Sequence, residues 1–123
     1  MKPKAGLLPL YLKLYDDTMP ELRATFSGML NGITARLTKR GISVCRAEVC
    51  RLKPEFAAAV EHFEKEDVDL IVTVHLAYSP SLESADILAR TSLPILMLDT
   101  TLDVRFPQTV DPMRLMYNHG IHG

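Results

Sequence analysis

One stretch predicts the architecture of the chain: Val68-Asp-Leu-Ile-Val-Thr-Val-His75-Leu-Ala-Tyr78-Ser79-Pro80. Residues 68–74 are apolar and β-branched almost throughout, which is typical of a strand buried on both faces of a parallel sheet. Ser79 is a good N-cap residue and Pro80 a good first helical residue, so we expect a helix to begin there. The loop between this strand and this helix then lies at the carboxyl end of the strand, where open α/β sheets bind ligands.

The same alternation of strand and helix continues on both sides of this unit. Further strands are expected at residues 5–10, 42–49 and 95–98. The hydrogen-bonded part of the first strand should end near Leu8, because Pro9 has no N–H to donate. Strands that alternate with helices predict a parallel sheet rather than a meander.

Three helices are expected between these strands and a fourth after the last of them. The first begins around Thr18 and ends at Gly41, which suits the left-handed position after a helix. The second opens with Lys53-Pro54-Glu55, and Asp111-Pro112 is the expected start of the fourth. Helical spacing gives one apolar face to the first helix, with Leu22, Phe26, Met29, Ile33 and Leu37, and to the second, with Phe56, Ala59 or Val60, and Phe63. Leu82, Ala85, Leu88 and Ala89 mark the third helix, and Met113 and Met116 should point inward in the fourth.

These elements predict a single flavodoxin-like α/β domain over residues 1–123. The expected architecture is a three-layer sandwich, in which a parallel sheet of about four strands carries helices on both faces. Right-handed crossovers and the doubly wound order place the first strand between the second and the third.

Composition narrows the function classes. With 14 Lys and Arg against 15 Asp and Glu, the net charge of -1 argues against a nucleic-acid partner or an anionic membrane. No apolar run approaches the roughly 20 residues of a membrane span, and no convincing signal peptide is present, so a cytoplasmic location is expected. Cys45 and Cys50 point to opposite faces of one expected strand, which argues against a disulfide.

Polar and aromatic residues follow three of the expected strands and should meet at one edge of the sheet. They are Tyr11, Lys13, Tyr15, Asp16 and Asp17 after the first strand, His75, Tyr78 and Ser79 after the third, and Asp99, Thr100, Asp103 and Arg105 after the fourth. Such a mixture suits a polyol ligand. The alternative for His75 is that it only closes a strand end and bonds the backbone.

Other chemistries find little support in the motifs. No glycine-rich nucleotide loop follows the first strand, and His75 stands where a receiver domain would carry its phosphorylated Asp. His119 and His122 would lie one turn apart on a helix, but no third ligand is near, so no metal site is predicted. A histidine-rich segment just after a helix has begun indicates that the chain is the first part of a longer protein.

Four segments together resemble the N-terminal domain of the L-arabinose/L-fucose isomerase superfamily, nearer the L-arabinose isomerase side. They are Leu14-Tyr15, Val74-His-Leu-Ala-Tyr-Ser-Pro80, Leu98-Asp-Thr-Thr101 and Asn118-His-Gly-Ile-His-Gly123. The resemblance implies an enzyme that interconverts an aldose and a ketose through an enediol, assisted by a divalent metal, typically manganese. It places the metal ligands and the catalytic residues in later domains, outside this chain.

The resemblance further implies that Tyr15, Tyr78, His119 and His122 contact the sugar substrate. It also implies a homo-oligomer in which this domain completes the site of a neighbouring subunit. The chain departs from the family at Leu10-Tyr-Leu-Lys-Leu and at His119, both places where the arabinose enzymes carry glutamine, which leaves the sugar open. The alternative function is a free-standing module that binds a small polar ligand at the same loops without catalysis.

Overall fold

The structure, a computed structural model, describes residues 2–77, 79, 81–101, 103, 105, 108–109, 111–112 and 114. The elements in chain order are β1 (Lys4–Leu10), α1 (Lys13–Thr18), α2 (Leu22–Lys39), β2 (Ser43–Arg46), α3 (Lys53–Lys65), β3 (Leu70–His75), a 3-10 turn (Ser81–Glu83), α4 (Ala85–Arg90) and β4 (Ile95–Leu98). All strand pairs are parallel, in the order β2-β1-β3-β4. This confirms the predicted parallel sheet and the place of the first strand between the second and third.

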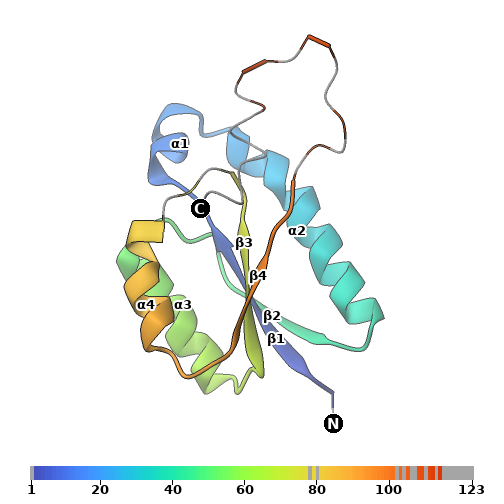
Figure 1. The fold of residues 1–123 in the computed structure, drawn as a ribbon, viewed down its shortest axis with the longest axis vertical. Coiled ribbons are helices and arrows are strands. Elements are labelled where there is room, and N and C mark those ends of the chain that lie inside the picture. Colours follow the sequence, from blue (N-terminus) through green and yellow to red (C-terminus); the bar gives the residue numbers. More distant parts are fainter. Residues whose placement is uncertain are drawn as a thin grey trace.

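The sheet is the middle layer of a three-layer sandwich, as predicted. One face packs against α2, and the other packs against α3 and α4 (Figure 1). Because successive residues of a strand point to opposite faces, Leu7 joins the core under α2 and Leu8 joins the core under α3. Phe26 and Phe63 are the largest fully buried side chains of these two cores.

Two local sequence signals produce the predicted ends of helices. Gly41 follows α2 with a φ of 84°, the left-handed conformation that glycine adopts without strain. The N–H groups of Gly41 and Ile42 donate to the carbonyls of Thr38 and Leu37 at 3.0 and 3.1 Å, which closes the helix. At the start of α3, the Glu55 carboxylate accepts the N–H of Leu52 at 3.1 Å.

The first strand is longer than predicted, because it continues through Pro9 to Leu10. The carbonyls of Leu7 and Pro9 accept the N–H groups of Ala47 and Cys50, each at 3.0 Å, so this side of β1 faces the β2 chain. The proline nitrogen therefore faces residues 47–49, where the chain has left the ladder. A missing N–H costs nothing at a position that has no acceptor opposite.

Other predicted boundaries were also wrong. The second strand covers Ser43–Arg46 rather than residues 42–49, and the third covers Leu70–His75 rather than 68–74. The predicted loop before α2 contains the short helix α1, and α2 itself begins at Leu22 rather than near Thr18. An ion pair one turn apart, Lys13 with Asp17 at 2.7 Å, accompanies α1.

The predicted N-cap at Ser79 is wrong as well. The Ser79 Oγ atom is buried and has no hydrogen-bond partner among the described residues. A 3-10 turn, Ser81–Glu83, follows instead, and α4 begins only at Ala85. The predicted fourth helix falls largely outside the described residues, including Met113 and Met116.

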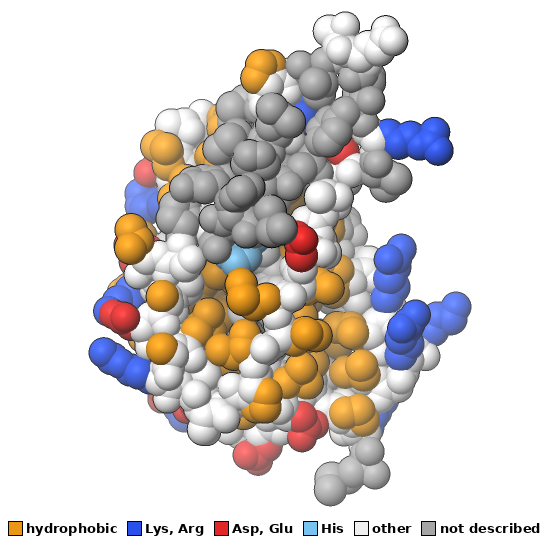
Figure 2. All heavy atoms as spheres, in the orientation of Figure 1, with side chains coloured by type: hydrophobic (Ala, Val, Ile, Leu, Met, Phe, Trp, Pro, Cys, Tyr) orange, Lys and Arg blue, Asp and Glu red, His pale blue; other side chains and the backbone are white. Residues whose placement is uncertain are grey.

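The last strand begins and ends as predicted but lies at the edge of the sheet. Ile95, Leu96 and Met97 are 39%, 53% and 66% exposed, although all three are apolar. Figure 2 shows hydrophobic side chains gathered over β4 and toward α2. Within the described part of the chain, no helix is both long and apolar enough to cross a bilayer.

Candidate ligand-binding pocket

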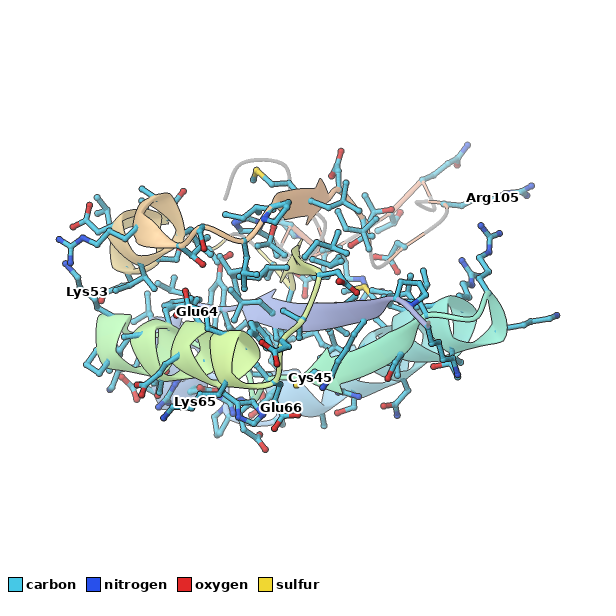
Figure 3. The ribbon with its side chains drawn as sticks, turned by 90° about the horizontal axis from the view of Figure 1, so that it is seen from below. Cys45, Lys53, Glu64, Lys65, Glu66 and Arg105 are labelled. Carbon is cyan, nitrogen blue, oxygen red and sulfur yellow. The ribbon has the colours of Figure 1, made fainter. Side chains whose placement is uncertain are left out.

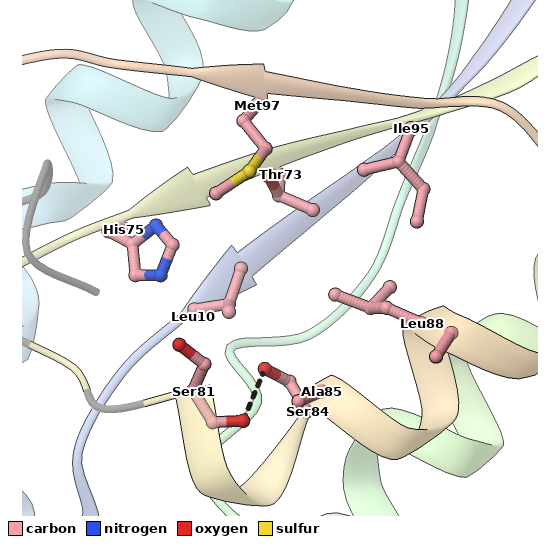
Figure 4. A pocket seen from close by; sticks show the side chains of 10 residues that line it. Leu10, Thr73, His75, Ser81, Ser84, Ala85, Leu88, Ile95 and Met97 are labelled. Carbon is pink, nitrogen blue, oxygen red and sulfur yellow. Dashed lines mark hydrogen bonds between the residues drawn. The ribbon is translucent and has the colours of Figure 1, made fainter.

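A cavity of about 240 Å³ lies between the carboxyl-terminal half of the sheet and α4 (Figure 4). The sheet register brings its floor together, because Leu10 lies beside His75, and Thr73 lies beside Met97. All four belong to the sheet face that α3 and α4 cover. Among the described residues, the lining is Leu10, Thr73, His75, Ser81, Ser84, Ala85, Leu88, Ala89, Ile95 and Met97.

The helix side of this cavity explains why space remains there. Ala85, Leu88 and Ala89 were predicted to belong to the third helix; they lie in α4 and line the cavity, with Ala85 and Ala89 exposed at its mouth. Two of the three are alanines, which are too short to reach the sheet. Leu82, also predicted to belong to this helix, lies in the 3-10 turn instead and is 88% exposed.

Contacts with α3 fix the position of α4. The Lys53 ammonium group pairs with Asp86 at 3.0 Å, and the Lys53 N–H donates to the Glu83 carboxylate at 2.8 Å. After α4, the Thr91 hydroxyl donates to Glu64 at 2.9 Å. Figure 3 shows Lys53 and Glu64 on α3. These contacts join α4 and the 3-10 turn to α3, while Ile87 and Leu88 of α4 pack toward the sheet, and the cavity lies beside this packing.

Two polar atoms on the cavity floor have no hydrogen-bond partner among the described residues. They are the Thr73 hydroxyl and the Nε2 atom of His75, whose residues are 1% and 7% exposed. A buried polar group without a partner costs about 1–3 kcal/mol, so nearly all such groups are satisfied in folded proteins. A ligand or water in the cavity would satisfy both atoms. Ser84, whose hydroxyl donates to the Ser81 carbonyl at 3.3 Å, adds a third polar group.

The cavity carries no charge to balance a charged ligand. Burial lowers the pKa of His75, so its ring is neutral at pH 7 and Nε2 can accept or donate one hydrogen bond. No Asp, Glu, Lys or Arg belongs to the lining. Placing an ion against the buried floor at Thr73 and His75 would remove part of its hydration without a counter-charge, which is costly. The walls are otherwise apolar, which does not suit the polyol that the loop residues suggested.

The residues predicted to contact a substrate lie elsewhere or outside the described chain. Tyr15 is buried in α1 and packs against Tyr11, with ring centroids 5.6 Å apart, in the core on the α2 side of the sheet. Its predicted contact with substrate stays a prediction. Tyr78, His119 and His122 lie outside the described residues. Sequence reasoning missed Thr73 and Met97, although a hydroxyl in an apolar strand was a visible signal.

The acidic residues predicted at this edge serve a different purpose. Asp16 pairs with Arg23 and, at 3.1 Å, with Arg51, which also pairs with Glu55 at 2.8 Å. The hydrogen bond from Arg51 lowers the pKa of Glu55 to about 2. These charges neutralise one another and join α1, α2 and α3. Among the described residues, no three His, Cys, Asp or Glu side chains gather as a metal site.

Comparison with known proteins gives a likeness of fold. No family model matches the sequence, and a search of curated proteins finds no match. The chain is similar to a solved structure, the Escherichia coli transcriptional repressor ascG, with a TM-score of 0.52 and 20% identity. The match covers 83% of this chain and 34% of that chain, so the chain spans about a third of the repressor's length. At this identity the likeness shows the fold alone.

This finding overturns the resemblance to the L-arabinose/L-fucose isomerase superfamily. A solved structure that shares the fold is a transcriptional repressor, and no family model and no curated protein matches the chain. Of the segments that carried the resemblance, residues 74–77 and 98–101 lie at or just after strand ends, where unrelated doubly wound domains can place similar residues, and Leu14-Tyr15 lies in α1. The isomerase activity, the enzyme assignment and the sugar-binding homo-oligomer are therefore withdrawn.

Two further expectations change with it. The exclusion of a nucleic-acid partner is withdrawn, because a transcriptional repressor contains this fold. The balanced charge of one domain does not describe the rest of such a protein. The manganese ion implied by the isomerase resemblance belonged to residues outside this chain. Because the resemblance is withdrawn, nothing supports a manganese ion any longer, and the structure does not test for one.

Proposed function

We propose that the chain is a non-catalytic module that binds a small, neutral and largely apolar molecule in the cavity beneath α4. The observation that carries this proposal is the pair of buried, unpartnered polar atoms on the cavity floor, at Thr73 and His75. An apolar pocket with a few convergent polar groups is the usual form of a small-molecule site. The two polar atoms would orient the ligand, and the apolar walls would supply most of the affinity.

The dimensions and charge of the cavity define the ligand class. A volume of about 240 Å³ corresponds to roughly eight waters at about 30 Å³ each. A single ring with one hydroxyl, amide or carbonyl group fits that space. The polar group belongs at Thr73 and His75, and the ring belongs between Leu88 and Met97.

A regulatory use agrees with the fold and with the position of the cavity. One structural neighbour is a transcriptional repressor. A ligand between α4 and the sheet would contact both and would favour the position of α4 to which it binds more tightly. A ligand shifts the balance between two conformations only when its affinities for them differ. Cys45 and Cys50 are free thiols, which supports a reducing, cytoplasmic location.

The test compares three probes of nearly equal size: benzyl alcohol, benzoate and benzylamine. Benzyl alcohol should raise the unfolding temperature in a saturable manner, whereas the two ions should not, because they lose hydration without gaining a counter-charge. The variant Ala85→Leu fills the cavity and should abolish the effect. Ala58→Leu makes the same change at an exposed position of α3 and should preserve it. Equal stabilisation by all three probes, or an unchanged response in Ala85→Leu, would overturn the proposal.

A further inference from the structure

A second hollow surface lies on the opposite face of the sheet, between α2 and β4. Two adjoining hollows of about 320 and 310 Å³ share Ile33, Arg36 and Thr100. We call this surface the α2–β4 groove and define it by Gly28, Gly32 and Arg36 on α2, Arg40 directly after α2, Leu98 on β4 and Thr100 after β4. None of these residues lines the cavity beneath α4, so the groove is independent of the proposed ligand site.

The α2 side of the groove is a single row of residues spaced four apart. Gly28 and Gly32 form the half of this row that has no side chains, and Arg36 and Arg40 form its cationic half. Residues at this spacing make one ridge along a helix. A Cβ atom added to either glycine would meet no atom within 4 Å, so the backbone of α2 is accessible there. A second helix can approach such a surface closely.

The rim of the groove carries cations, and its floor is apolar. Arg36, Lys39 and Arg40 form no ion pair with any residue that the structure describes. The helix dipole favours cations in the last turn of α2, but it does not explain the apolar surface beside them. On that face of β4, Leu96 is 53% exposed and Leu98 is half-buried.

We propose that the α2–β4 groove binds an acidic amphipathic helix of a partner protein. A helix laid beside α2 would pack its apolar stripe on Leu98 and Ile33, the mode by which grooves recognise helices. Carboxylates four residues apart on that helix would match the spacing of Arg36 and Arg40, and each pair would form charge-assisted hydrogen bonds. The partner segment is therefore a helix with leucine-like residues on one face and Glu or Asp along one flank.

The experiment uses the full chain and two synthetic helical peptides of about 18 residues, with the same leucine stripe and either Glu or Lys on the flanks. Fluorescence anisotropy should show binding of the Glu peptide that weakens as salt is added. The double variant Arg36→Glu, Arg40→Glu should lose about tenfold in affinity for the Glu peptide and gain affinity for the Lys peptide. Arg90→Glu, the same change on α4 across the sheet, should behave as the unmodified chain does.

Gly32→Ala separates groove binding from a general effect on the fold. This change should stabilise α2 because alanine favours helix, yet it should weaken the Glu peptide by occupying the groove. Three outcomes would overturn the proposal: equal binding of both peptides, unchanged binding by the double arginine variant, or self-association of the chain that excludes the peptide. The last outcome would assign the groove to a second copy instead.

Discussion

Thr73 and His75 distinguish the sheet from an ordinary buried core. Each is preceded along β3 by a buried valine, and both side chains line the cavity on the face that α4 covers. Threonine suits a strand because it is β-branched, but its hydroxyl needs a partner once it is buried. The fold therefore tolerates two unsatisfied polar atoms at one place, and such places are expected at functional sites.

Replacement of Thr73 by Val should affect stability and binding in opposite directions. Valine has nearly the same shape and removes the unsatisfied hydroxyl, so the free energy of unfolding should rise by about 1 kcal/mol. Affinity for benzyl alcohol should fall by about fivefold, because one hydrogen bond is lost. Urea unfolding and a ligand titration measure the two effects. The control is Thr34→Val, which removes a hydroxyl bonded to the Leu30 carbonyl and should not stabilise the chain. A lower free energy of unfolding in Thr73→Val would contradict the absence of a partner for the Thr73 hydroxyl.

The stability of the chain should depend on pH through His75. Burial lowers the pKa of His75 below its ordinary value of 6.5. As the pH falls through 6.5, the unfolded chain gains a proton that the folded state resists, so the free energy of unfolding decreases toward the lowered pKa. His75→Leu should remove this part of the pH dependence in unfolding measured at pH 7.5 and pH 5. His62→Leu, at an exposed position of α3, should keep this part of the pH dependence. The same pH dependence of the free energy of unfolding in both variants would contradict the role of His75.

At the scale of elements, local signals predicted what local chemistry controls. The start of α3 at Lys53, the glycine after α2 and the residues of β4 all follow from capping, backbone conformation or apolar pattern. The missed features depend on distant contacts. Pro9 stays in β1 because the β2 chain leaves the ladder there, and Ser79 does not cap because the helix begins later. The cavity itself results from contacts between α3 and α4 that no short motif encodes.

Two glycines should respond to alanine with opposite signs. A Cβ atom at Gly6 would lie 2.8 Å from the Phe63 ring, so Gly6→Ala should destabilise the packing of α3 on β1 by about 1–3 kcal/mol. Gly32→Ala meets no neighbour within 4 Å in the interior of α2 and should stabilise by about 0.5–1 kcal/mol. Chemical denaturation measures both. Phe63→Leu should recover part of the loss in Gly6→Ala, and strictly additive effects would show that the ring is not the obstacle.

The start of α3 should lose stability in acid. Arg51 lowers the pKa of Glu55 from 4.5 to about 2, so the contribution of the carboxylate is complete above pH 4.5 and is lost as the pH falls toward 2. Glu55→Gln should therefore lower the free energy of unfolding by about 1 kcal/mol at pH 7, since the pair is partly screened by solvent. The deficit should disappear near pH 2. Glu61→Gln, which breaks an exposed pair with Lys65, is the control; an equal loss in both variants would contradict the role of Glu55.

At the scale of the whole molecule, the two halves of the sheet differ. The central strands β1 and β3 are buried between α2 and α3, whereas β4 lies at the edge and exposes apolar side chains. Neighbouring residues of β4 serve the two proposed surfaces: Met97 lines the cavity beneath α4, and Leu98 lines the α2–β4 groove. The buried strands β1 and β3 therefore supply stability, and the surfaces on either side of β4 form the two proposed binding sites.

The most direct test of ligand binding beneath α4 is an NMR titration of methionine-methyl-labelled protein with benzyl alcohol. Met97 lines the cavity, whereas Met29 packs on the α2 side of the sheet and serves as an internal reference. The methyl signal of Met97 and the ring signals of His75 should shift together and saturate with one dissociation constant, while the Met29 signal stays in place. A saturating shift at Met29 without one at Met97, or no saturable shift at either, would contradict the account.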